Sequence, residues 1–132
     1  MYNKEHNLDK LKRLTNNLVS FDEITKTRGK GYLELEMING TALGWNLLHE
    51  KDISVDKWFV SKGSTFPNHV HEELEILTVF QGIMIMKIDG KEVELKKGST
   101  YYITPNMEHS AHYPDDCFFI TITIPCGEGF PK

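Results

Sequence analysis

The sequence predicts an all-β fold, an antiparallel sandwich or barrel, and three observations support this prediction. From Tyr32 onward, short apolar or alternating runs follow one another, separated by turn residues. Two of the turns contain Asn39-Gly40 and Asp89-Gly90, which are strong short-range signals for two-residue hairpins. No stretch after Gly40 fits a helix of any length.

Each apolar run is expected to form one strand. The expected strands cover residues 32–38, 42–48, 57–60, 75–80, 83–88, 91–95, 99–104 and 117–124. The chain before them differs, because leucines in residues 7–19 fall on one helical stripe: Leu8, Leu11, Leu14 and Leu18. We therefore divide the chain into an N-terminal helical extension and connector (1–31) and a β domain (32–132). The short helix is expected to pack against the body of the fold or against a partner subunit.

Composition restricts the class of protein. A chain of 132 residues is expected to form a single domain around a hydrophobic core. Its net charge is −4 and its lysines are dispersed, which argues against nucleic acid as a partner. No apolar run approaches ~20 residues and the N-terminus has no apolar leader, so neither membrane insertion nor secretion is expected. Cys117 and Cys126 flank one strand and are expected to be reduced thiols in a cytoplasmic protein.

A group of potential metal ligands lies between residues 63 and 82. His69 and His71 are two residues apart, so on a strand both imidazoles project from the same face. Glu75 follows four residues later. Neutral imidazoles and a carboxylate suit divalent transition metals, which predicts the beginning of a metal site. A third nitrogen has to come from elsewhere in the chain.

Two histidines are candidates for that third nitrogen. His109 follows Pro105 by four residues, and in a small barrel a loop leaving one strand can return it to the strand of His69. His112 is the second candidate, although on a strand it would face the side opposite to His109. The spacing in sequence does not decide between them.

A resemblance to a known family favours His109. Five residues are spaced as in the first motif of the cupin superfamily, which they resemble without any insertion or deletion: Gly63, His69, His71, Glu75 and Gly82. Gly98, Pro105 and His109 resemble the second motif. The second motif departs from the family pattern in three ways. The gap before Pro105 is one residue longer, Met107 stands where a small residue is common, and Tyr113 replaces a closing Asn.

The resemblance implies a fold, a site and a range of functions. The fold would be a cupin-type antiparallel β-barrel, also called a double-stranded β-helix or jelly roll. In it His69, His71, Glu75 and His109 would hold one divalent metal, which could be Fe, Mn, Ni, Co, Cu or Zn. The barrel would bind a small organic molecule, as a metal-dependent dioxygenase, isomerase or decarboxylase, or else as a non-catalytic ligand-sensing or storage module with a separate partner.

Two further expectations concern the surroundings of the site. The resemblance, together with the need to cover edge strands such as 32–38, predicts a homodimer. Some side chains of the alternating strands should line the pocket and make it largely apolar, and Tyr102, Met86 and Phe119 are candidates.

Overall fold

A computed structural model describes residues 32–127 of the chain, and these residues form ten antiparallel strands in two sheets. This confirms the predicted all-β fold. The strands are β1 (Tyr32–Met37), β2 (Gly40–Glu50), β3 (Ile53–Val60), β4 (Thr65–His69), β5 (Leu74–Gln81), β6 (Ile83–Ile88), β7 (Lys91–Lys96), β8 (Thr100–Ile103), β9 (His109–His112) and β10 (Cys117–Ile124). The predicted helix over 7–19 and the boundary at residue 31 precede the described residues.

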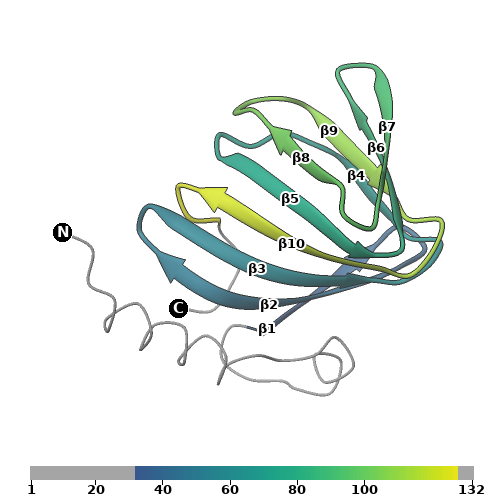
Figure 1. Cartoon of the computed structure of the whole chain (residues 1–132), viewed down its shortest axis with the longest axis horizontal. Helices are drawn as coiled ribbons and strands as arrows, with labels where there is room; N and C mark the ends of the chain where they lie inside the picture. Colours follow the sequence, from purple (N-terminus) through teal and green to yellow (C-terminus); the bar gives the residue numbers. More distant parts are fainter. Residues whose placement is uncertain (1–31, 128–132) are drawn as a thin grey trace.

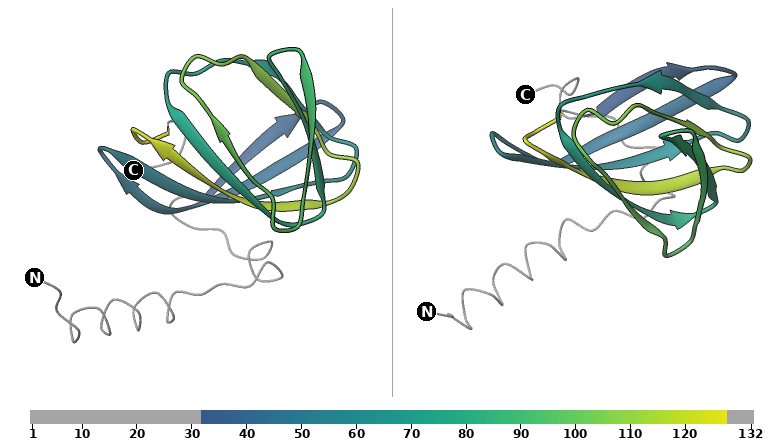
Figure 2. Two further views of the ribbon diagram at one scale, coloured as in Figure 1. Left: turned by 45° about the horizontal axis from the view of Figure 1, so that its top comes forward. Right: turned by 90° about the horizontal axis from the view of Figure 1, so that it is seen from above.

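The two sheets face each other across the core (Figures 1 and 2). The larger sheet has the strand order β1-β2-β3-β10-β5-β8, and the smaller has the order β4-β9-β6-β7. Neighbouring strands such as β3, β10 and β5 are far apart in the sequence, as expected for a jelly roll and unlike a simple meander. A bridge between Ile38 and Thr65 joins the sheets near β1 and β4.

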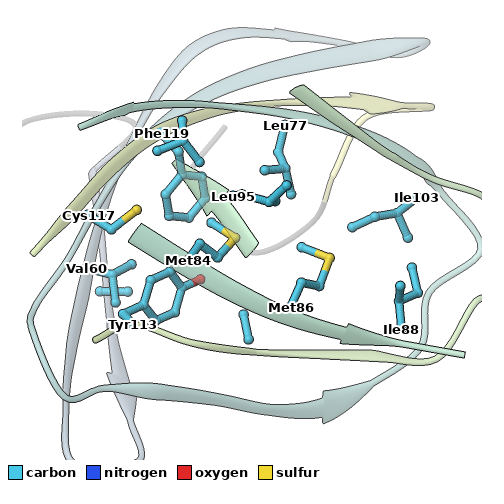
Figure 3. Close-up of a cluster of buried hydrophobic side chains, with 13 residues drawn as sticks. Val60, Leu77, Met84, Met86, Ile88, Leu95, Ile103, Tyr113, Cys117 and Phe119 are labelled. Carbon is cyan, nitrogen blue, oxygen red and sulfur yellow. The ribbon is translucent and has the colours of Figure 1, made fainter. Parts of the chain in front are cut away.

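The core lies between the sheets and is built by alternation along the strands (Figure 3). On β10, the inward residues Cys117 and Phe119 are buried, whereas their outward neighbours are only half-buried. Leu77, Val79 and Met84 are at most 2% exposed. Burying a side chain of this size fully contributes about 2 kcal/mol to stability.

The first predicted hairpin forms, but its turn lies one residue earlier than the sequence suggests. Met37 pairs with Gly40, so Ile38 and Asn39 form the loop, and only Asn39 has a positive φ, of 61°. Gly40 is needed for space instead, because a Cβ there would collide with the Ser64 hydroxyl. At the second hairpin both Asp89 and Gly90 have positive φ, of 49° and 72°, as predicted for a type I′ turn.

Gly82, at the end of the first motif, has two reasons to be glycine. Its φ of 87° lies in the left-handed region, which side chains disfavour. A Cβ at this position would also collide with the backbone carbonyl of Asp116. Gly82 therefore allows β5 to turn into β6 directly beneath the loop that leads into β10.

Candidate metal centre

His69 and His109 are brought together by strand pairing. His69 is the last residue of β4, His109 is the first of β9, and the two are register partners in the β4–β9 ladder. The register shifts between Phe66 and His69, around Pro67, which has no N–H to donate to the ladder. His109 is 3% exposed, so this pairing buries its imidazole inside the fold.

His71 lies in the loop after β4, not on the strand as predicted. Because β9 begins at His109, the ladder has no partner for residues beyond His69 and the strand ends there. The His71 ring nevertheless faces the same cavity, with its centroid 5.7 Å from that of His69 and 4.9 Å from that of His109. The backbone N–H of Asn106 donates a hydrogen bond of 2.8 Å to the carbonyl of His71, which fixes this loop against the β8–β9 connection.

The three histidines present their ring nitrogens to one another. One potential ligand atom from each of His69, His71 and His109 lies within 4.8 Å of the other two. The Nδ1 of each ring is hydrogen-bonded to a backbone carbonyl: His69 to Pro67 at 2.9 Å, His71 to Glu73 at 2.9 Å, and His109 to Met107 at 2.8 Å. A carbonyl only accepts, so each Nδ1 carries the proton in these bonds and each Nε2 is left with its lone pair. Backbone bonds of this kind orient metal-ligating histidines.

Glu75 reaches the histidines from the other sheet. It stands near the start of β5, and its Oε1 lies 3.5 Å from Nε2 of His71. The closeness of this carboxylate to Nε2 is the main reason that the pKa of His71 is raised, whereas burial lowers the pKa of His69. The structure therefore brings together all four residues predicted from the sequence: His69, His71, Glu75 and His109.

His112 is not part of this group. It is exposed, and its Nδ1 lies 2.9 Å from the hydroxyl of Thr65. The odd spacing from His109 places it on the opposite face of β9, as the period of two requires.

The donor set fits a divalent transition metal. Nε2 of His71 is buried and makes no hydrogen bond, although Oε1 of Glu75 lies 3.5 Å away, and a cation coordinated between these atoms would satisfy both. Three imidazole nitrogens and a carboxylate oxygen would leave one or two positions of an octahedron for water or substrate.

A cavity of about 430 Å³ opens beside the four residues. Most of its wall is apolar and comes from both sheets, including Phe66, Leu77, Met84, Met86, Tyr113 and Phe119. Met86 and Phe119 were predicted to line the pocket and do so. Tyr102 was also predicted there, but it is 57% exposed on the outside of β8, because it pairs with the outward-facing Ile76.

Asp56, a further residue of this cavity, was not singled out from the sequence. It lies on β3, is 4% exposed, and accepts a hydrogen bond of 2.6 Å from the side-chain amide of Asn46. Burial raises its pKa to about 6. Alternation along β3 could have revealed it, because Asp56 shares the inward face with Trp58 and Val60.

The fold and the site define a class of small β-sandwich protein with a histidine-lined pocket. A family model described as the cupin domain matches residues 57–123, just over half of the sequence. The chain therefore belongs to the cupin superfamily, as its two motifs suggested. No curated protein matches the sequence.

Solved structures with low sequence identity share the fold. A predicted oxalate decarboxylase from Thermotoga maritima has a TM-score of 0.67 at 21% identity, over 82% of this chain and 98% of that one. An ectoine synthase from P. lautus has a TM-score of 0.68 at 14% identity, over 83% and 78%. An RmlC-like cupin from Shewanella frigidimarina has a TM-score of 0.66 at 20% identity, over 77% and 91%. Among the described residues, no helix has the length and apolar character needed to span a membrane.

Proposed function

We propose that this cupin holds one divalent transition metal through His69, His71, Glu75 and His109 and binds a small organic molecule beside it. The observation that carries the proposal is the orientation of the imidazoles. All three donate Nδ1–H to backbone carbonyls, and the Nε2 atom of His71 is buried without a hydrogen-bond partner. A polar pocket without a cation would leave these lone pairs facing one another at a cost in free energy.

The cavity is suited to a small and largely apolar ligand. Its volume of about 430 Å³ lies within the range of ligand pockets, and its wall is mainly aliphatic and aromatic. When bound, the metal would supply a Lewis acid, or a centre for dioxygen activation, at its open coordination positions. The chemistry fits a dioxygenase acting on the ligand or an isomerase acting on a carbonyl or enediol.

The large sheet adds polar groups to the cavity besides the histidines. Asp56, Thr121 and Thr123 line the cavity from β3 and β10, and Glu75 stands on the neighbouring β5. A ligand with a hydroxyl group would donate a hydrogen bond to Asp56 while its apolar part packs against Phe119. Because the pKa of Asp56 is raised to about 6, this carboxyl group can hold or release a proton near neutral pH.

Two further features belong to the proposal. β1 is an edge strand of the large sheet, which supports a homodimer that covers this edge. Cys117 and Cys126 are both free, which supports a reducing compartment such as the cytoplasm.

Oxygen uptake by the Fe(II)-reconstituted protein tests the dioxygenase version. The protein is loaded anaerobically and exposed to oxygen with a panel of diketones, thiols and phenolics, and His69→Ala and His112→Ala are the site and control variants. We expect uptake with at least one compound in the wild type and in His112→Ala, but not in His69→Ala. If no compound causes uptake, the dioxygenase version is wrong.

The same panel separates catalysis from sensing. Ligand binding is measured by calorimetry to the metal-loaded wild type and to His69→Ala. An enzyme that binds its substrate at the metal should lose affinity in the variant. Equal binding to both proteins would favour the alternative, a ligand-sensing or storage cupin that acts with a separate partner.

A further inference from the structure

The outer face of the large sheet, which points away from the small sheet, is unusually apolar. Only the inner face has to be apolar to form the core between the two sheets. On β10, the side chains facing the cavity include two threonines, Thr121 and Thr123. Those facing outward are one phenylalanine and three isoleucines: Phe118, Ile120, Ile122 and Ile124. A strand exposed to water on its outer face should show the opposite distribution.

The apolar character continues across neighbouring strands. The pairing register places one outward residue from each of five strands in a single row: Leu48, Val55, Ile122, Ile76 and Tyr102. A second pair lies four residues further along β3 and β10, where the ring centroids of Phe59 and Phe118 are 4.7 Å apart. We call the surface formed by these residues, together with Ile120 and Ile124, the outer apolar face.

No described element covers this face. All ten strands of residues 32–127 belong to the two sheets, so the described fold has no third layer. Leu48 and Tyr102, at the two ends of the row, are 40% and 57% exposed. A contiguous apolar surface of this kind indicates a binding partner.

We propose that residues 7–19 of the same chain dock on the outer apolar face through Leu8, Leu11, Leu14 and Leu18. The first argument is where the preceding chain joins the fold. It enters at Tyr32, the first residue of β1, which is an edge strand of this same sheet. The Tyr32 ring packs on Trp45 with centroids 5.1 Å apart, on the outer side of the sheet.

The second argument is length. A helix rises about 15 Å between Leu8 and Leu18. The apolar row crosses five strands and therefore spans about 19 Å. The 12 residues from 20 to 31 can extend to about 40 Å, enough to place the helix over any part of the face.

The third argument is charge. Lys10, Lys12 and Arg13 flank the leucines in the sequence. Glu34 and Glu36 lie on the outward side of β1, at the edge of the face, because they pair with Leu43 and Thr41. A helix laid on the isoleucines would bring its basic side chains near this acidic edge. The docking depends on none of the metal ligands, so it can hold or fail independently of the proposed function.

Amide hydrogen exchange on the full-length protein tests this proposal with a matched pair of variants. Leu14→Asp places a carboxylate on the leucine stripe, and Asn16→Asp places one on the opposite side of the same helix. We expect the amides of residues 7–19 to be protected about 10-fold or more in the wild type and in Asn16→Asp. Leu14→Asp should lose this protection, while the amides of β10 stay protected because the core is unchanged.

Light scattering on the same three proteins identifies the occupant. Docking within one chain predicts the same molar mass for all three. If Leu14→Asp lowers the mass, the face is covered by a second copy and the proposal is wrong. Absence of protection in the wild type, or protection that survives in Leu14→Asp, would also overturn it.

Discussion

His69 and His109 are register partners at the ends of β4 and β9, and their ring centroids lie 4.1 Å apart. The closeness of these two imidazoles therefore depends on the backbone ladder between two short strands. His71 is attached to the same place by the hydrogen bond from Asn106 to its carbonyl. The geometry of the site should consequently respond to changes in the backbone as well as to changes in the ligands.

Asn106 provides the first test of this dependence. Its φ is 64°, in the left-handed region, so Asn106→Ala should cost about 1–2 kcal/mol of stability and weaken metal binding through displacement of His71. Asn106→Gly is the matched control, because glycine accepts this φ and keeps the backbone N–H. Calorimetric metal titration and thermal unfolding measure both effects. Equal metal affinity in the alanine and glycine variants would contradict the positioning role.

Gly82 and Gly63 form a second matched pair, because both have a φ of 87° but differ in surroundings. Gly82→Ala should prevent stable folding, since its Cβ meets the carbonyl of Asp116. Gly63→Ala has open space around the added methyl group and should cost only about 1–2 kcal/mol. Chemical denaturation compares the two variants. If both lose the same stability, steric contact at Gly82 is not decisive.

Asp56 should give the metal-free protein a pH-dependent stability. Its pKa is raised from 3.8 to about 6, so between these values the folded state binds more protons than the unfolded state. The free energy of unfolding should therefore fall as pH rises from about 4 to 7, by up to about 3 kcal/mol. Denaturation of wild type and Asp56→Asn across this range measures the difference. Asp56→Asn should lose this part of the pH dependence of the free energy of unfolding. If the free energies of the two proteins change with pH in parallel, the raised pKa of Asp56 is contradicted.

Metal binding should weaken in acid, because imidazoles must be neutral to coordinate. In the metal-free protein His71 should take up a proton before His69, since Glu75 raises the pKa of His71 and burial lowers that of His69. The apparent metal affinity should decrease about 10-fold or more per pH unit below ~6.5. Titration of the metal at several pH values tests this. An affinity that is constant from pH 7 to 5 would exclude histidine ligands.

The sequence predicted the strands well where alternation was strong. Runs such as IMIMKI and KEVEL match β6 and β7 almost to the residue, because each has one buried face. β9 was missed, because four residues reading HSAH carry little apolar alternation and pair only through the tertiary fold. The same shortness explains why His71 lies outside β4.

The candidate site was predictable in part. The motif spacing predicted His69, His71, Glu75 and His109 as ligands, and the strand register explains how His109 comes to lie beside His69. Asp56 was overlooked because the strand expected from the sequence began at residue 57, whereas β3 begins at Ile53 and includes Asp56 on its inward face. Tyr102 was assigned to the wrong face because the apolar run 99–104 has no clear alternation of its own.

Elemental analysis of the purified protein tests the metal site most directly. The wild type and His112→Ala should each contain about one equivalent of a divalent transition metal, whereas His71→Ala should contain far less, because it loses one of four ligands. His112→Ala is the matched control, since it removes an imidazole outside the cluster. A wild-type protein that contains no such metal and binds none on titration, or a His71→Ala variant that retains a full equivalent, would contradict the proposed metal centre.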